Sequence, residues 1–165
     1  MRKVLFLCVG NSCRSQMAEG FARAYGSDVM EAASAGLAPA AIVQPLTKEV
    51  MLAKNIRLDG QYPKDLASLN PGNFDLIVNM SGTKLPAKPP VEVRDWPIED
   101  PIGRSEEVYL AVRDEIERLV MSLILELRRK DRKPELESRD NPRGKRRPPG
   151  RKKNAAPEMF IPEPR

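Results

Sequence analysis

The sequence predicts an α/β fold of three layers, α/β/α, built around a four-stranded parallel sheet. Within residues 1–129, short apolar stretches typical of buried strands alternate with segments of helical periodicity. Alternation of this kind is typical of a parallel sheet with both faces covered. The first apolar stretch runs directly into a polar loop and then a helix. That loop therefore lies at the carboxyl end of a strand, where sheets of this class bind ligands.

Four strands and four helices are expected in this part of the chain. The strands cover residues 2–8, 29–34, 74–80 and 91–96, and the helices cover residues 15–25, 45–55, 63–69 and 105–129. Gly26 ends the first helix, Pro45 takes the first position of the second, and Ser105 is the N-cap of the last. The last helix carries an apolar stripe formed by Val108, Val112, Ile116, Leu119, Leu123 and Leu127.

The chain divides into a near-neutral domain, residues 1–129, and a basic tail, residues 130–165. The tail holds twelve Lys and Arg against six Asp and Glu, a net charge of +6, and seven of the sixteen prolines. The domain holds sixteen basic and seventeen acidic side chains, a net charge of −1. This composition predicts a disordered tail. A solvated extension is the favoured interpretation, with a loose nucleic-acid contact as the alternative.

The cysteine and histidine counts limit the chemistry. Two cysteines and no histidine favour a reduced setting, and they exclude metal sites and Cys/His dyads that need histidine. We see no apolar stretch of the length expected for a membrane span or a signal peptide. We therefore expect a cytoplasmic protein with no membrane contact, no bound metal and no bound cofactor.

The loop between the first strand and the first helix is the candidate site. Cys8 begins it, Arg14 and Ser15 end it at the helix, and the residues between are Val9, Gly10, Asn11, Ser12 and Cys13. Gly10 and Asn11 readily adopt the left-handed conformations from which backbone N–H groups converge. The helix N-terminus and the planar Arg14 fork favour a bound tetrahedral oxyanion and a Cys8 thiolate. Cys8 and Arg14 alone would suit a buried structural cysteine, but strand, turn and helix together favour an anion-binding loop.

A second feature, Glu99-Asp100-Pro101, lies between the last strand and the last helix. The predicted topology places it over the same sheet edge as Cys8. Asp100 is the candidate general acid, which would protonate the oxygen that leaves the bound oxyanion. An Asp-Pro pair is also a turn and helix-entry signal, and Glu99 is the competing acid.

The string GNSCRSQMAEG at residues 10–20 resembles the low-molecular-weight protein-tyrosine-phosphatase superfamily, and within it the arsenate reductase branch. The resemblance covers about residues 2–128. It implies the phosphatase-like fold, a catalytic Cys8, an oxyanion-binding loop closed by Arg14, and an acid at Asp100. The stretch 94–101, the segment 113–116 and the turn at 34–37 are also similar to the reductase side. The phosphatase branch usually has an aromatic residue after its Asp-Pro pair, whereas Ile102 follows here.

The resemblance implies two alternative reactions. In an arsenate reductase, Cys8 attacks arsenate and another thiol reduces the adduct, which releases arsenite. In a phosphatase, water hydrolyses a cysteinyl-phosphate with help from Asp100. Thioredoxin-coupled members carry two further cysteines after the third strand, but here Ser81 stands at the first of these positions and no cysteine follows Cys13. A reductase with this sequence must use an external glutathione- or mycothiol-like thiol with a glutaredoxin- or mycoredoxin-type partner.

Three further alternatives remain at this stage. Cys13 is interpreted as structural filler, although a protective disulfide with Cys8 is the competing interpretation. Ser15 either donates a hydrogen bond to the Cys8 sulfur or caps the helix, or does both. A non-enzymatic oxyanion-binding module with a nucleic-acid-binding tail is disfavoured by the intact set of Cys8, Arg14 and Asp100.

Overall fold

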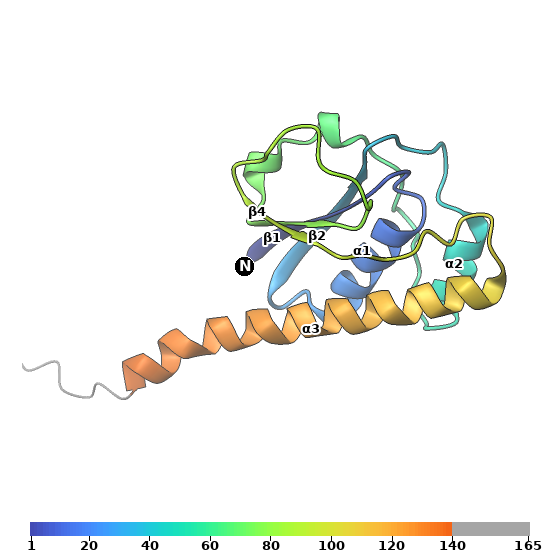
Figure 1. The fold of residues 1–165 in the computed structure, drawn as a ribbon. Helices are drawn as coiled ribbons and strands as arrows, with labels where there is room; N and C mark the ends of the chain where they lie inside the picture. The colour runs from blue at the N-terminus through green and yellow to red at the C-terminus, as the bar shows by residue number, and fades with distance from the viewer. Residues whose placement is uncertain (140–165) are drawn as a thin grey trace, which may run out of the picture.

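The computed structural model describes residues 1–139, with side chains through residue 133 (Figure 1). Strands and helices alternate up to the third strand, and the fourth strand follows the third with no helix between them. The strands are β1 (Arg2–Cys8), β2 (Met30–Gly36), β3 (Leu76–Asn79) and β4 (Glu92–Asp95). The helices are α1 (Arg14–Tyr25), α2 (Pro45–Leu52) and α3 (Glu106–Arg139), with two short 3-10 turns, η1 (Leu66–Ser68) and η2 (Pro71–Asn73).

The four strands form one fully parallel sheet in the order β2-β1-β3-β4, which confirms the predicted four-stranded parallel sheet. At the carboxyl end of β1, Cys8 pairs with Gly36 of β2, and Leu7 pairs with Asn79 of β3. The loops that follow β1, β2 and β3 therefore leave the sheet at one edge, around Cys8.

The two faces of the sheet are covered differently. Helix α1 packs against β1, β2 and α3, and α2 packs against α3, so the helices share one face, as Figure 1 shows. Val4, Phe6 and Cys8 of β1 point into this larger core. The opposite face is covered by η1, η2 and the loop between β3 and β4. Its small core has four buried residues, Leu5, Leu7, Ala35 and Ile77.

The helix expected at residues 63–69 is wrong, because only the turn η1 forms there. The Asp65 side chain accepts a hydrogen bond from the Ala67 N–H, and Asn70 accepts one from the Gly72 N–H. Such local bonds from a side chain to the backbone two residues on favour turns over helices. The second strand also differs from its expected range, since β2 continues to Gly36 as the partner of Cys8.

Helix α3 extends ten residues beyond its predicted end at Arg129. Residues 130–139, which were assigned to the disordered tail, are therefore helical. Ion pairs from Lys130 to Glu126 and from Arg2 to Asp131 hold this extension, in a segment rich in Lys, Arg and Glu, which are good helix formers. The rest of the predicted tail, residues 140–165, lies outside the described residues. Within residues 1–139, no helix is both long and apolar enough to cross a lipid bilayer.

Candidate active site

The loop after β1 directs its carbonyl groups away from its centre. The segment that follows β2 donates backbone N–H groups to four of these carbonyls. These bonds run from Leu37 to Cys8, from Ala38 to Val9, from Ala40 to Gly10 and from Gln44 to Ser12, at 2.8–3.1 Å. The fifth carbonyl, that of Asn11, accepts the Gln16 side-chain amide at 2.9 Å. Every carbonyl from residue 8 to residue 12 is thus satisfied on the outside of the loop.

The backbone N–H groups of the same loop are left available for a ligand. Among the described residues, none of the N–H groups of residues 9–15 donates a hydrogen bond to another protein group. Asn11 takes the left-handed conformation, with φ of 48°, that a nest of converging N–H groups requires. Helix α1 begins at once, with no side-chain cap and no acidic residue in its first turn. The loop and the helix N-terminus therefore form a site for an anion.

Gly36 is required where β2 passes closest to the loop. A Cβ atom at this position would lie 2.7 Å from the Val9 carbonyl oxygen and 2.9 Å from the Asn11 nitrogen. Both are backbone atoms of the loop, so a larger residue would have to displace the loop itself. The sequence analysis placed Gly36 only in a turn and did not connect it with the site.

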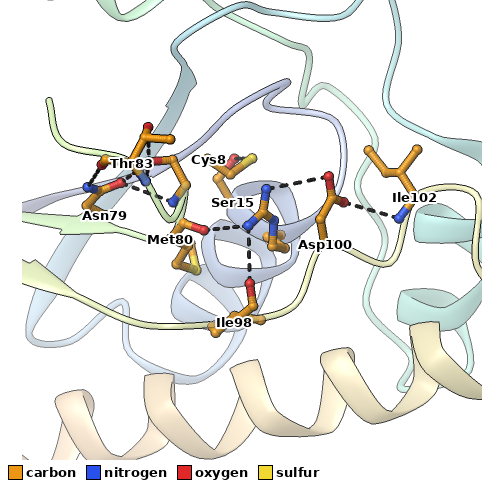
Figure 2. Close-up of polar contacts among 10 residues, drawn as sticks. Cys8, Ser15, Asn79, Met80, Thr83, Ile98, Asp100 and Ile102 are labelled. Carbon is orange, nitrogen blue, oxygen red and sulfur yellow. Dashed lines mark hydrogen bonds and ion pairs between the residues drawn. The ribbon is translucent and has the colours of Figure 1, made fainter. Parts of the chain in front are cut away.

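The Cys8 sulfur accepts a hydrogen bond from a hydroxyl whose direction is fixed by its neighbours. The Asn11 side-chain oxygen accepts the Lys64 backbone N–H at 2.8 Å, so its amide nitrogen faces Ser15 and donates to the Ser15 Oγ, also at 2.8 Å. With that oxygen already accepting, the Ser15 hydrogen is free to point at the Cys8 Sγ, 2.9 Å away. Hydrogen bonding of this polarity stabilises a thiolate. Figure 2 shows Cys8 and Ser15 together at the centre of the site.

The expectation that Ser15 caps the helix is wrong. The N-cap position is Cys13, which makes no side-chain cap, and Ser15 is the second residue of α1. Its hydroxyl is therefore free of any capping role and serves the sulfur of Cys8.

The buried guanidinium of Arg14 joins the loop to the ends of the neighbouring strands. Its Nη1 donates to the carbonyl oxygens of Met80 at 2.6 Å and Ile98 at 3.2 Å, the contacts drawn around these residues in Figure 2. Its Nη2 lies 3.7 Å from the Asp100 Oδ2. The Nε and Nη2 groups carry the N–H bonds that remain for an anion.

The structure separates the two candidate acids. Asp100 is half-exposed and lies beside Arg14, whereas Glu99 pairs with Arg104 on the outside of the segment. The Asp100 Oδ1 also accepts the Ile102 N–H at 3.1 Å, so the turn role expected of the Asp-Pro pair is present as well. Asp100, not Glu99, is thus the carboxyl group brought to the loop.

The second cysteine is buried and protonated. Burial raises the pKa of Cys13 from 9.0 to about 12, an effect that a hydrogen bond with Thr47 partly offsets. Neither cysteine forms a disulfide in this structure. Thr47 also donates to the Ser12 carbonyl at 3.2 Å. Nearby, burial raises the pKa of Tyr109, and the negative charge of Asp100 adds to this effect.

Several supporting residues of the site were not found from the sequence. The Gln61 side chain donates to the Gln16 side chain at 2.8 Å, which braces the amide that holds Asn11. Ser34 and Glu19, expected to support the loop, form a buried pair at 2.8 Å on the flanking elements.

The Ser12 hydroxyl is buried without a partner among the described residues. Among the side chains that the structure describes, those of residues 1–133, there is no group of three or more His, Cys, Asp or Glu that could hold a metal ion.

Comparison with known proteins places this geometry in a family. Residues 3–133 match the family model described as low molecular weight phosphotyrosine protein phosphatase. A glutaredoxin arsenate reductase of Synechocystis sp. is 34% identical over 131 residues, which cover 77% of this chain and 99% of that protein. A solved arsenate reductase in the phosphate binding state superposes with a TM-score of 0.71 at 35% identity, covering 77% and 99% of the two chains. An arginine phosphatase from Geobacillus stearothermophilus superposes with a TM-score of 0.66 at 25% identity, covering 79% and 95%.

The raised pKa of Cys13 predicts a loss of stability at alkaline pH. The unfolded chain ionises this thiol near pH 9.0, whereas the folded protein holds its proton up to about pH 12. The contribution of the Cys13 thiol to the free energy of unfolding is therefore at its maximum below pH 9.0, and it is lost as the pH rises towards 12. We expect wild type to lose roughly 2 kcal/mol more than Cys13→Ala between pH 8 and pH 11, measured by urea unfolding. An identical pH dependence of the two proteins would contradict the assignment.

The close approach at Gly36 predicts that Gly36→Ala disturbs anion binding. The added methyl group must displace the backbone of Val9 or Asn11, and we expect the affinity for inorganic phosphate to fall by about tenfold or more in isothermal titration calorimetry. Gly72→Ala is the matched control, because a Cβ there would meet only side-chain atoms, of Asn70 at 3.2 Å and Pro90 at 3.8 Å, on the other face of the sheet. Equal phosphate affinity of Gly36→Ala and wild type would show that the loop tolerates the methyl group.

Proposed function

The chain belongs to the low molecular weight phosphotyrosine protein phosphatase family, and from this premise we propose that it is an arsenate reductase that acts through a Cys8 thiol–arsenate adduct. The observation that carries the proposal is the loop of residues 8–14, whose carbonyls bond outward and whose N–H groups are free. Arsenate and phosphate are tetrahedral oxyanions of similar shape and charge, so this loop suits either. The arsenate reductases among the relatives, at 34% and 35% identity, favour arsenate as the substrate.

Binding of arsenate uses the loop, the helix N-terminus and Arg14. The free N–H groups of residues 9–15 surround the oxyanion, and the dipole of α1 favours its negative charge. Arg14 contributes its Nε and Nη2 donors while Nη1 stays bound to Met80 and Ile98. The anion therefore binds without breaking an existing protein hydrogen bond of these groups.

The first chemical step is the attack of the Cys8 sulfur on arsenic. An S–As bond forms, and an As–O bond breaks as the leaving oxygen departs as water. The Ser15 hydroxyl, 2.9 Å from the sulfur, holds the thiolate before the attack. Asp100 lies beside Arg14 and supplies a proton to the leaving oxygen as general acid.

The second step requires an external thiol. A thiolate attacks the Cys8 sulfur, the S–As bond breaks, and its electron pair passes to arsenic, which leaves as arsenite. Cys8 remains as a mixed disulfide, and a second external thiol reduces it and regenerates the Cys8 thiol. Cys13 does not supply the thiolate, because burial raises its pKa to about 12. A glutathione-like or mycothiol-like thiol with a glutaredoxin- or mycoredoxin-type protein fits this requirement.

Hydrolysis of phosphate esters is the second candidate function. The family name and the arginine phosphatase among the similar structures favour it. In this reaction Cys8 would take the phosphoryl group, and Asp100 would first protonate the leaving alcohol and then assist the attacking water. The loop geometry suits both reactions, so the two functions differ in whether water or a thiolate attacks the covalent adduct on Cys8.

Paired assays of the purified protein test the two functions. We expect arsenite release from arsenate, coupled to oxidation of glutathione with glutaredoxin or of mycothiol with mycoredoxin. Turnover of p-nitrophenyl phosphate without arsenite release would overturn the reductase proposal in favour of the phosphatase. Cys8→Ser should abolish both activities with an unchanged circular dichroism spectrum, whereas Cys13→Ala should retain the greater part of them. Activity that survives in Cys8→Ser would end the assignment of the nucleophile.

Asp100→Asn tests the general acid. Loss of a positioned acid costs about 10²- to 10⁴-fold in rate, so we expect kcat to fall within this range, most strongly for substrates with poor leaving groups. Glu99→Gln is the matched control, since Glu99 carries the same charge one residue away but pairs with Arg104. Steady-state rates with a series of aryl phosphates of different leaving-group acidity measure the effect. A larger loss in Glu99→Gln than in Asp100→Asn would transfer the role to Glu99.

A further inference from the structure

The sheet face opposite α1 and α3 is covered without a long helix. Among the described residues, Leu5, Leu7, Ala35 and Ile77 are buried there beneath η1, η2 and the β3–β4 loop. Leu66, Leu85 and Val93 belong to this covering layer and remain partly exposed. A further apolar segment that packed on this layer would bury these side chains.

An apolar hollow of about 310 Å³ lies on this face, between the 3-10 turns and the β3–β4 loop. Ile77 of β3, Leu66 of η1 and Leu85 of the loop line it together with several prolines. Lys88 is its only charged lining residue. Neither Lys88 nor the exposed Lys84 of the same loop forms an ion pair with residues 1–133.

The chain itself contains a segment that matches this hollow. Residues 157–164 read PEMFIPEP, in which Met159, Phe160 and Ile161 form an apolar triplet flanked by Glu158 and Glu163. We propose that this C-terminal segment binds in the hollow, with Phe160 against the partly exposed Leu66 and Leu85 and its two glutamates near Lys84 and Lys88. The triplet would supply the apolar cover, and the opposite charges would fix its position.

The chain between α3 and the segment is long enough for this contact. Twenty residues separate Arg139, the last residue of α3, from Phe160. Fully extended, they reach up to about 70 Å, whereas the 34 residues of α3 are about 51 Å long. The segment can therefore return from the end of α3 to the hollow without moving any described element.

The site differs from the catalytic loop and does not depend on the proposed function. Cys8 points to the helical face of the sheet, whereas Ile77 points to the opposite face. The contact would hold equally in a reductase and in a phosphatase. A second copy of the chain, or a foreign acidic peptide, could use the same chemistry, and the experiment separates these occupants.

Methyl NMR of the full chain tests the proposal. We expect Phe160→Ala to shift the methyl signals of Ile77, Leu66 and Leu85, and Pro148→Ala, a change in the same tail outside the segment, to leave them in place. Lys88→Glu should shift the same signals, and adding Glu158→Lys and Glu163→Lys to it should restore them. These tail changes lie outside residues 1–139, and unchanged signals of the helical core would serve as the folding control.

Two results would overturn the proposal. Identical Ile77, Leu66 and Leu85 signals in wild type and Phe160→Ala would show that the segment does not occupy the hollow. The methyl signals should also be recorded over a range of protein concentrations, with the molar mass measured by light scattering. If the signals change as the mass rises from that of a monomer to that of a dimer, the hollow binds the segment of a second copy. Signals independent of concentration and sensitive to Phe160→Ala support binding within one chain and exclude a foreign peptide as the occupant.

Discussion

The outward bonding of the loop carbonyls is the constraint on which the site depends. Each peptide unit is planar, so a carbonyl fixed on one side of the loop directs the N–H group of the same unit to the other side. The segment after β2 fixes four of the five carbonyls between Cys8 and Ser12. Small residues at Gly36, Ala38 and Ala40 allow this close approach. The anion site is therefore a product of two neighbouring parallel strands and not of the loop sequence alone.

Arg14 connects the loop after β1 to β3 and β4, in the other half of the sheet. A buried guanidinium is costly without partners, and Arg14 finds them in carbonyl groups that follow β3 and β4, at Met80 and Ile98. The loop after β1 is thereby tied to the strand ends beside it. Asp100 lies two residues after Ile98, which explains how a half-exposed loop carboxylate reaches the catalytic loop. One side chain thus contacts the ends of two neighbouring strands and the carboxylate of Asp100.

The fold could be predicted from the sequence, and so could the position of the candidate groups at one edge of the sheet, because both depend on local patterns. The strand, turn and helix around Cys8 and Arg14 follow from residue types within a dozen positions. The failures have a different origin. Helix α3 continues through good helix formers that the tail's overall composition concealed, and η1 is limited to one turn by the local bond from the Ala67 N–H to Asp65. The roles of Gly36 and of the Gln61–Gln16 pair depend on segments that meet only in the folded chain, so no local pattern could identify them.

The choice between reduction and hydrolysis is made after the sulfur has bonded to its substrate. In the proposed mechanisms both reactions would use the same loop, and Asp100 would protonate the leaving oxygen in each. Hydrolysis then needs only water, whereas reduction needs a thiolate at the sulfur of Cys8, a residue that is 3% exposed. Cys13 is poorly suited to provide this thiolate, because burial raises its pKa to about 12. The exposed apolar residues Val9, Ile42 and Ile102 belong to the catalytic loop, the segment bonded to it and the acid's own turn. Water attacks the phosphorus or arsenic atom of the adduct and releases the sulfur, whereas a thiolate attacks the sulfur itself, so the outcome depends on which of the two reaches the adduct first.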